Sequence, residues 1–327
     1  MDYLAVDSGT TNSRVWLMRD LKILDRRQVE VGVRNTAIDG NSRALMAGIR
    51  GAISELRGSG SGVNPRFVIA AGMITSNLGL HEVEHADAPA GMNELALKVE
   101  KRVFPEIDDL PFYFIPGVRS GPPKATLGQV NAIDIIRGEE TEVLGALQKL
   151  KLDGPLLYIH LGSHTKLIKV NGSNRIIGGR STLAGELLQA VRSHTILRDS
   201  LPQNSTESLD LRFLDQGWDN ARAYGFFRAL YLVRVLHLSS NNSKECIQSF
   251  LLGSILSEEF RCLDSLLEEE PYDKFILSGL PHFQPAWRYF LGRRKCDFRT
   301  LSADQTEALF LRGLYEILKR SSQCSPP

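Results

Sequence analysis

The sequence predicts an α/β protein built from two domains, and three observations lead to that expectation. Strand-like and helix-like segments alternate along the chain, as in proteins whose sheets are flanked by helices. The length of 327 residues exceeds what one hydrophobic core usually serves. A strand, a turn of small and hydroxyl residues and a second strand occur near the N-terminus and again after residue 155. We therefore expect one such hairpin in each half of the chain.

The first hairpin begins almost at the N-terminus. Residues 3–6 form a short apolar run that stops at Asp7, and residues 14–17 resume β-type side chains. The turn between them offers N–H and hydroxyl donors to an anion, from Gly9, Thr10 and Thr11. Asp7 at the end of the strand can hold a hydrated Mg²⁺ that bridges phosphates. An ordinary Asx-turn hairpin explains the same residues, so both interpretations stay open here.

The second hairpin repeats this design. An apolar strand at 156–159 meets a turn of small and hydroxyl residues, and a second strand follows at 166–170. The turn and the residue after it are Gly162, Ser163, His164, Thr165 and Lys166. One copy in each half of the chain predicts two loops that clamp the phosphates of a nucleotide. Chance similarity of two meanders is the alternative.

Apolar spacing predicts further strands and helices between the two hairpins. They are a strand at 22–33, a helix at 42–57 capped by Ser42, a flexible loop at 58–65, a strand at 66–71, a helix at 93–104 and a strand at 111–118. The strand at 66–71 ends in a polar segment that contains Gly72, Met73, Ser76 and Asn77. Loops beyond the carboxyl ends of strands are where α/β proteins bind ligands, so this segment is a candidate contact with substrate.

A helix is predicted over the second half of residues 131–150, with Glu139 and Glu140 near its start. Acids suit the positive end of a helix dipole, so helix chemistry explains these glutamates as readily as catalysis does.

The pattern after the second hairpin is largely helical. We expect a helix at 182–197, a polar linker at 199–210, helices across 211–267 broken at 239–243, a strand at 274–277, a helix through Trp287, a strand at 297–301, a helix at 304–319 and a frayed tail at 321–327.

Composition narrows the class of protein. A net charge of +1 gives no excess of positive charge that would indicate binding to nucleic acid or to an anionic membrane. The four cysteines lie in the C-terminal quarter without a C-x-x-C pair, which predicts neither a zinc site nor a disulfide framework. We see no signal peptide and no apolar run long enough to span a bilayer. The expected location is the cytoplasm.

Seven segments, in order along the chain, resemble one family of kinases. They are residues 6–14, 71–77, 115–117, 136–141, 162–166, 182–187 and 278–279. Together they resemble the 2-dehydro-3-deoxygalactonokinases of the actin/hexokinase/Hsp70 ATPase superfamily. The tip at 7–11 is typical of the whole superfamily. The segments R-G-E-E-T at 137–141 and A-G-M-x-x-S-N at 71–77 are much more specific.

The resemblance implies two ribonuclease H-like lobes, with mixed sheets flanked by helices and a cleft between the lobes. Residues 1–150 would form the N-terminal lobe with the sugar-acid site and the first phosphate loop. Residues 151–327 would form the C-terminal lobe with the second phosphate loop and the adenosine site, its last helix packing near the hinge. The implied reaction is transfer of the γ-phosphoryl of ATP, with Mg²⁺, to the terminal 6-hydroxyl of 2-dehydro-3-deoxy-D-galactonate.

The resemblance also implies roles for individual residues. The metal ligand would be Asp7, and the base would be Glu139 as first choice or Glu140 as second. The groups that hold ATP would be Asp7, Gly9, Thr10, Thr11, Arg14, Gly162, Ser163, His164, Thr165, Lys166 and Gly279. The groups that hold the sugar acid would be Asn12, Gly72, Met73, Ser76, Asn77 and Arg137. Either arginine could instead read phosphate or the substrate carboxylate.

Three positions depart from the family pattern. His160 stands where the second loop often begins with an acid, and Ser8 and Leu167 replace aromatic residues. Two alternative functions therefore stay open: a kinase for another small sugar or sugar acid, and a non-catalytic sensor that binds nucleotide or sugar. The expected partner is a small-molecule sugar acid, with neither nucleic acid nor membrane, and the chain could also pair as a homodimer.

Overall fold

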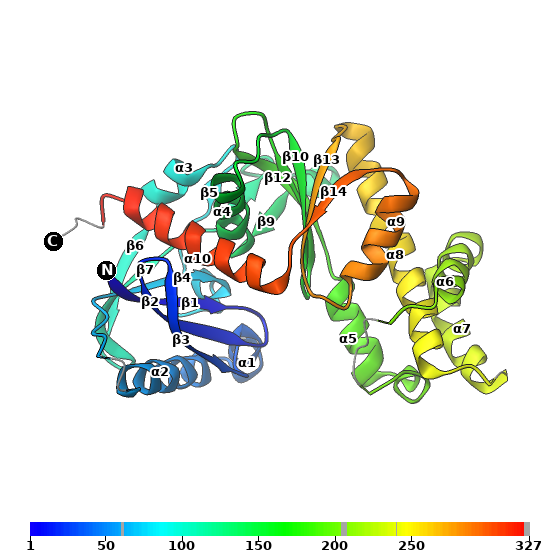
Figure 1. Cartoon of the computed structure of the whole chain (residues 1–327), viewed down its shortest axis with the longest axis horizontal. Coiled ribbons are helices and arrows are strands. Elements are labelled where there is room, and N and C mark those ends of the chain that lie inside the picture. The colour runs from blue at the N-terminus through cyan, green and yellow to red at the C-terminus, as the bar shows by residue number, and fades with distance from the viewer. Residues whose placement is uncertain (60–61, 204–207, 240, 324–327) are drawn as a thin grey trace. The chain divides into compact units, whose positions relative to one another are not determined.

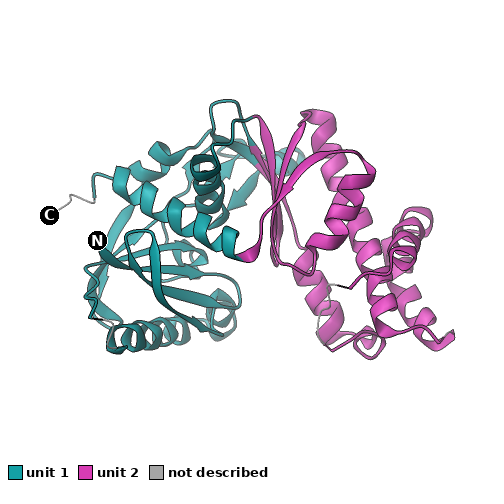
Figure 2. Cartoon of the chain, viewed as in Figure 1, with its two compact units in different colours: residues 1–154, 170–178, 304–327 teal, residues 155–169, 179–303 magenta. Residues whose placement is uncertain are grey.

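The computed structural model describes residues 1–59, 62–203, 208–239 and 241–323. The chain divides into two compact units, shown in Figure 2. Unit 1 comprises residues 1–154, 170–178 and 304–327, and unit 2 comprises residues 155–169 and 179–303. Each unit contains its own sheet. The expected assignment of a role to each of the lobes 1–150 and 151–327, and the cleft between them, stay predictions.

Unit 1 is built on a six-stranded sheet with the order β3-β2-β1-β4-β7-β6 (Figure 1). Its strands are β1 (Asp2–Ser8), β2 (Ser13–Arg19), β3 (Lys22–Val29), β4 (Val68–Gly72), β6 (Glu100–Phe104) and β7 (Asp108–Phe114). The central strand β1 pairs antiparallel with β2 and parallel with β4. Residues 3–6 of β1 are fully buried on both faces of the sheet, which explains why the strand reads as a continuous apolar run.

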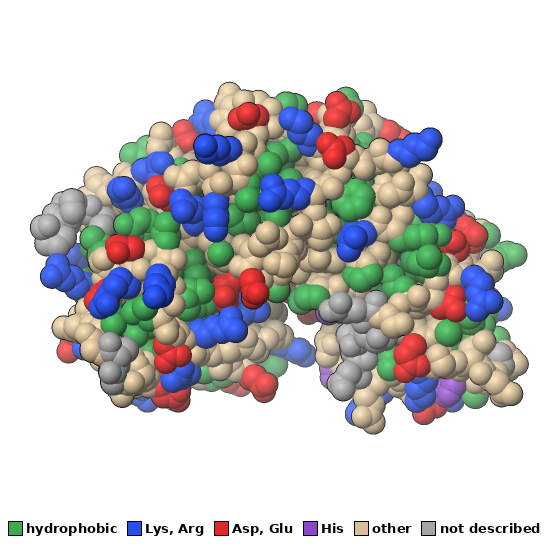
Figure 3. Space-filling model, in the orientation of Figure 1, with side chains coloured by type: hydrophobic (Ala, Val, Ile, Leu, Met, Phe, Trp, Pro, Cys, Tyr) green, Lys and Arg blue, Asp and Glu red, His purple; other side chains and the backbone are tan. Residues whose placement is uncertain are grey.

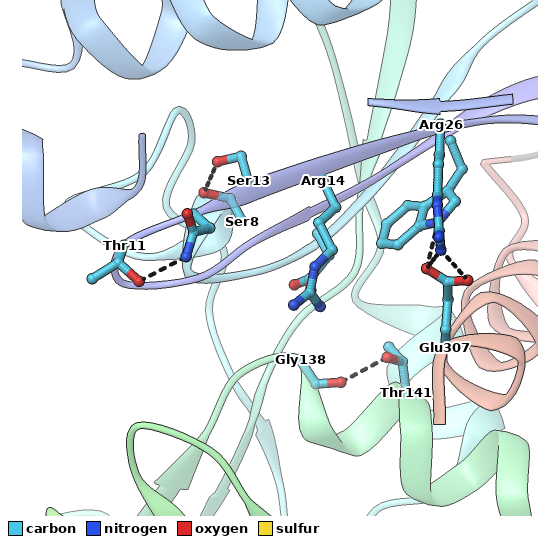
Figure 4. Close-up of polar contacts among 11 residues, drawn as sticks. Ser8, Thr11, Ser13, Arg14, Arg26, Gly138, Thr141 and Glu307 are labelled. Carbon is cyan, nitrogen blue, oxygen red and sulfur yellow. Dashed lines mark hydrogen bonds and ion pairs between the residues drawn. The ribbon is translucent and has the colours of Figure 1, made fainter. Parts of the chain in front are cut away.

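The helices of unit 1 pack beside this sheet. They are α1 (Val33–Asp39), α2 (Arg43–Gly58), α3 (Met92–Leu97), α4 (Glu139–Leu150) and α10 (Ala303–Arg320), and a small sheet consists of β5 (Ala86–Asp87), β8 (Val118–Ser120) and β9 (Asp134–Ile136). Helix α2 buries Leu45 and Ile49 in the core formed with β1, β2 and β4. Glu307 anchors α10, because its carboxylate accepts from Trp16 Nε1 at 3.0 Å and from Arg26 Nη1 at 3.1 Å (Figure 4).

Unit 2 contains a five-stranded sheet with the order β12-β11-β10-β13-β14. Its strands are β10 (Leu156–Leu161), β11 (Thr165–Val170), β12 (Ile176–Thr182), β13 (Lys274–Gly279) and β14 (Asp297–Thr300). Its helices are α5 (Ala184–His194), α6 (Leu211–Tyr224), α7 (Phe226–Ser239), α8 (Lys244–Glu269) and α9 (Gln284–Arg293). Helix α8 is buried along most of its length, which makes it the centre of the apolar core of this unit.

The two sheets share one plan. In each, the first strand lies between its hairpin partner and a parallel strand from later in the chain, which gives β3-β2-β1-β4-β7 in unit 1 and β12-β11-β10-β13-β14 in unit 2. Residues Asp7 and His160 occupy equivalent positions, opposite Ala71 and Ser278 on the parallel neighbours. The predicted fold class, mixed sheets flanked by helices in two related halves, is confirmed.

Most predicted elements are confirmed, but several of their boundaries are wrong. The strand expected at 111–118 ends at Phe114, and the helix expected at 182–197 spans Ala184–His194, because Thr182 still belongs to β12. The helix expected at 93–104 ends at Leu97, and residues 100–104 form edge strand β6 instead, since pairing with β7 outweighs their helical spacing. The strand expected at 22–33 ends at Val29, and α1 begins at Val33. Parts of the expected loop at 58–65, linker at 199–210, break at 239–243 and tail at 321–327 lie outside the described residues.

Charged side chains of both signs are interspersed over the face shown in Figure 3, as the net charge of +1 suggests. None of the helices in the described part of the chain is long and apolar enough to cross a membrane.

Candidate functional site

The predicted site residues fall into two groups, one in each unit. In unit 1 the group centres on Asp7. The register of β1 and β2 places Asp7 opposite Arg14, with 3.7 Å between Asp7 Oδ2 and Arg14 Nη1. The Arg14 side chain is 53% exposed and that of Asp7 is 27% exposed, so solvent and small molecules reach both charges.

Glycine at position 72 lets strand β4 end directly beside Asp7. Gly72 has a φ of +86°, and a Cβ there would lie 2.9 Å from Asp7 Oδ1 and 2.8 Å from the Ser8 carbonyl oxygen. A side chain would therefore collide with the carboxylate and strain the backbone. Gly138, the residue before α4, also approaches this strand end, because a Cβ on Gly138 would lie 3.2 Å from Gly72 Cα.

Unit 1 thus gathers Asp7, Gly72 and the N-terminus of α4 at one place. Arg14 points from β2 toward Gly138 and Thr141 at this end of α4 (Figure 4). The two predicted glutamates are the first two residues of that helix. Segments that lie 60 to 130 residues apart in the sequence are therefore adjacent in the fold.

The structure separates the two glutamates. Glu140 is fully buried, and both of its carboxylate oxygens accept from the Gly138 N–H, at 2.9 and 2.8 Å. Glu139 is half-buried, and its Oε2 is a buried acceptor without a hydrogen-bond partner among the described residues. Buried acceptors normally find a donor. Glu139 is therefore the glutamate with an oxygen available to a ligand, whereas Glu140 shapes the start of the helix.

Burial also makes Glu140 a pH-sensitive element of stability. Desolvation raises the pKa of Glu140 from 4.5 to about 8, and the neighbouring charge of Glu139 adds to the rise. The folded state therefore keeps a proton that the unfolded state loses above about pH 4.5, so the free energy of unfolding falls as the pH rises from 4.5 to 8. Each unit of pKa is worth about 1.4 kcal/mol, so the fall should reach a few kcal/mol.

We expect Glu140→Gln to remove most of this pH dependence, because the amide stays neutral at every pH in the window. Urea unfolding at pH 5.5, 7.0 and 8.5 measures the free energy of unfolding of both proteins. The wild-type value should fall more steeply than the variant value, and the variant should be the more stable protein at pH 8.5. Parallel curves would show that Glu140 does not titrate in this range.

Arg137 holds the start of α4 against the loop that follows β4. Its guanidinium donates to the Thr75 carbonyl oxygen at 2.5 Å, to Thr75 Oγ1 at 2.8 Å and to the Val83 carbonyl oxygen at 3.0 Å. His85 Nδ1 lies 3.4 Å from Arg137 Nη2. Arg137 therefore has several protein partners, whereas the more exposed Arg14 faces the Asp7 carboxylate at 3.7 Å.

His85 is a residue that the sequence did not point to. Burial and the charge of Arg137 lower its pKa to about 4, so the ring is neutral at pH 7. Its Nε2 is buried without a hydrogen-bond partner among the described residues. A single histidine in a polar loop gives no sequence signal, since its environment comes from Gly117 and Arg137 on other segments.

The first hairpin tip is tied to the beginning of α1. Val33 N donates to the Gly9 carbonyl oxygen at 3.2 Å, and Arg34 N donates to that of Thr10 at 2.9 Å. Thr11 and Asn12 hydrogen-bond to each other at the end of the tip, at 3.1 Å. Ser8 is fully buried and its hydroxyl lies 2.9 Å from that of Ser13. The serine that replaces an aromatic residue thus belongs to the interior of the hairpin.

In the polar segment after β4, one predicted side chain makes hydrogen bonds within the segment and two others are accessible. Ser76 is buried, donates to the Met73 carbonyl oxygen at 2.7 Å and accepts from Leu78 N at 3.3 Å. Asn77 is exposed, and the Met73 side chain is half-buried. Met73 and Asn77 are therefore the members of this segment that a ligand could contact without breaking a hydrogen bond.

In unit 2 the second hairpin tip is enclosed by the beginning of α5. Glu186 N donates to the Ser163 carbonyl oxygen at 2.7 Å, and Glu186 Oε2 lies 3.0 Å from His164 Nε2. A Cβ on Gly185 would lie 2.2 Å from the Gly162 carbonyl oxygen, so only glycine permits this approach. This arrangement parallels the contact between α1 and the first tip.

The other predicted residues of unit 2 line the same sheet. Lys166 is buried and donates to Ser181 Oγ at 3.0 Å. His160 Nδ1 lies 3.3 Å from Ser278 Oγ on β13. Gly279 ends β13 with a φ of +94°, and Leu280 N donates to the Leu161 carbonyl oxygen at 2.6 Å. Gly279 therefore makes the same kind of turn beside β10 that Gly72 makes beside β1.

The fold belongs to the actin-like ATPase class. The activator of the 2-hydroxyisocaproyl-CoA dehydratase from Clostridium difficile, solved with bound ADPNP, has a TM-score of 0.53 and 13% identity. That similarity covers 98% of this chain and 96% of the solved chain. A crystal structure described as that of a candidate 2-dehydro-3-deoxygalactonokinase from Sinorhizobium meliloti has a TM-score of 0.72 and 23% identity, over 95% of this chain and 97% of the other.

Within this class, the chain belongs to the 2-keto-3-deoxy-galactonokinase family. A model of that family matches residues 7–317. The 2-dehydro-3-deoxygalactonokinase of Escherichia coli (strain K12) is 27% identical over 260 residues, which are 79% of this chain and 78% of the relative. The family resemblance noted in the sequence is confirmed, and the protein is a kinase.

Proposed function

We propose that this kinase transfers the γ-phosphoryl group of ATP to the 6-hydroxyl of 2-dehydro-3-deoxy-D-galactonate. Membership of the family supports the substrate. The observation that carries the chemistry is Glu139 Oε2, a buried acceptor without a partner among the described residues, at the helix end where Asp7 and Gly72 also lie. A hydroxyl bound there would donate to Glu139, which takes its proton as the new P–O bond forms.

Phosphoryl transfer depends mainly on positioning and on neutralising charge, and the proposed ATP contacts fit that need. The tips at Gly9–Thr11 and Gly162–Lys166 supply backbone and hydroxyl donors for phosphate oxygens. Gly279, at the end of β13, is the proposed contact with adenosine. Backbone N–H groups at the beginning of a helix donate to the carbonyl oxygens of each tip. These hydrogen bonds fix the conformation of the tip before ATP binds.

The residues around Asp7 fit a magnesium ion. A carboxylate oxygen is a ligand that Mg²⁺ accepts, and glycine at position 72 keeps the space beside Asp7 Oδ1 free of a side chain. No group of three or more His, Cys, Asp or Glu side chains gathers as a metal site anywhere in the described ranges. A bound Mg²⁺ would therefore draw its remaining ligands from phosphate and water, and it would neutralise charge on the phosphates.

The two arginines are assigned different tasks. Arg14 is exposed and points toward the helix end that carries Glu139, so we propose that it contacts phosphate. Arg137 has protein partners on Thr75, Val83 and His85, so its contribution to the sugar-acid site is to hold the loop that carries Met73, Ser76 and Asn77. Asn12, Gly72, Met73 and Asn77 stay proposed contacts with the sugar acid.

A coupled ATP-depletion assay over a panel of acceptors tests the proposed function. We expect turnover with 2-dehydro-3-deoxy-D-galactonate, and little with neutral sugars or with aldonic acids that lack the 2-keto group. Faster turnover with another sugar or sugar acid would instead assign a different substrate to the same machinery. Nucleotide binding without turnover on any acceptor would favour a sensor and overturn the proposal.

Three further expectations from the sequence stay predictions. The lobe 1–150 is proposed to bind the sugar acid, and the lobe 151–327 the adenosine. A cytoplasmic location is proposed from the metabolic role of the family. A homodimer is tested by light scattering of the purified chain, which gives the mass in solution.

A further inference from the structure

Glu259 is a buried acid of unit 2 that the proposed mechanism does not use. It lies on α8, with 5% of its surface exposed. Its Oε1 accepts from the Thr182 hydroxyl at 2.5 Å, and its carboxyl also hydrogen-bonds to the Thr165 hydroxyl. Burying an acid costs free energy unless its polar atoms are satisfied. The two threonines supply that satisfaction from two different strands.

Each of these threonines lies next to a segment that forms or contacts the second hairpin tip. Thr165 is the first residue of β11, directly after Gly162–His164. Thr182 is the last residue of β12 and lies two positions before α5. The beginning of α5 in turn encloses the tip, through Glu186 N on the Ser163 carbonyl oxygen and Glu186 Oε2 near His164 Nε2. One carboxyl therefore joins the strand that leaves the tip to the helix start that supports it.

We propose that Glu259 is a positioning residue for ATP, which sets the conformation of residues 162–165 by holding Thr165 and Thr182 together. The inference rests on the proposed function, in which this tip holds phosphate. Donors that stabilise phosphate act well only when they are already aimed at it, since a small displacement weakens each hydrogen bond. Loss of the carboxyl would leave the buried Thr165 hydroxyl and the half-buried Thr182 hydroxyl without this acceptor, and the tip would lose its fixed geometry.

Two substitutions at this position make the test. Glu259→Gln keeps the shape and one carbonyl acceptor, so it should leave the KM for ATP within about twofold of wild type. Glu259→Leu removes the acceptor and should raise the KM for ATP and the dissociation constant of ADP by about tenfold or more. The KM for the sugar acid should stay unchanged in both variants. Steady-state kinetics and calorimetry with ADP provide these numbers.

Glu258→Gln is the matched control, because Glu258 lies on the same helix and its carboxylate pairs with Arg261 at 3.0 Å near the surface. It should behave as wild type.

Thr182→Val is the second variant, and it removes one of the two hydroxyls that hydrogen-bond to Glu259. A severalfold rise in the ADP dissociation constant is expected for this variant, even if Glu259→Leu does not fold.

Wild-type ADP affinity in both Glu259→Leu and Thr182→Val would overturn the inference. So would an equal rise in the KM values for ATP and for the sugar acid, which indicates a general structural defect. Failure of the proposed function is distinguishable, because a wild-type chain that phosphorylates no acceptor still reports ADP affinity by calorimetry. A Glu259 effect in that measurement would survive without the kinase assignment.

Discussion

Glu139→Gln is expected to lower kcat by about 10²- to 10⁴-fold, which is the usual contribution of a general base. The amide keeps the size of the side chain and can still receive a hydrogen bond from the acceptor hydroxyl, but it cannot take the proton. The KM for ATP should stay within about twofold of wild type, because Glu139 is not a proposed ATP contact. Initial rates over a matrix of ATP and sugar-acid concentrations separate these two quantities.

Glu140→Gln is the control for this variant. Glu140 follows Glu139 directly but is fully buried, and its oxygens accept from Gly138 N. We expect it to retain most of the turnover while showing the altered pH dependence of stability described above. The reverse result, an active Glu139→Gln and an inactive Glu140→Gln, would transfer the role of base to Glu140. Equal and large losses would indicate that the two carboxyl groups act as a unit.

The sequence predicted the local motifs correctly, because the residues that form each motif are close together in the chain. Both predicted hairpins form, and their turns, residues 9–12 and 162–164, join adjacent strands of equivalent sheets. The sheet order itself was not readable, because it depends on pairing between β1 and β4 and between β10 and β13, more than 60 and 110 residues apart. Residues 100–104 show the same limit, since their spacing fits a helix and only the pairing with β7 makes them a strand.

The candidate site shows where sequence reasoning stops. The adjacent glutamates at 139 and 140 are alike in the sequence. Only the structure shows that Glu140 accepts from Gly138 N, whereas Glu139 Oε2 has no hydrogen-bond partner in the described part of the chain. Arg137 belongs to a motif that the sequence shows, but its hydrogen-bond partners Thr75 and Val83 lie more than 50 residues earlier in the chain. Such hydrogen bonds are set by tertiary packing, and no local spacing encodes them.

Asp7→Asn is the second substitution with a large expected effect. If the Asp7 carboxylate helps to hold Mg²⁺ against the phosphates, its neutral analogue should lower kcat/KM by about 10²-fold or more, since each factor of ten corresponds to about 1.4 kcal/mol of lost charge stabilisation. The concentration of Mg²⁺ that gives half-maximal rate should rise as well. The fold should persist, because the Asp7 side chain is partly exposed and the amide keeps its size.

Asp2→Asn is a matched control on the same strand. Asp2 is the first residue of β1 and Asp7 is its last but one, and each faces an arginine on β2 in the same antiparallel register, Arg19 in one case and Arg14 in the other. Asp2 and Arg19 form a bidentate pair, with bonds of 2.8 and 3.0 Å, so the control removes the closer of the two ion pairs. If only the ion pair mattered, Asp2→Asn would disturb the strand more than Asp7→Asn. We expect the opposite order for activity, with a normal magnesium dependence in Asp2→Asn. Near-wild-type kinetics in Asp7→Asn would remove this carboxylate from the magnesium site, and the phosphates would then depend on the tips and on Arg14 alone.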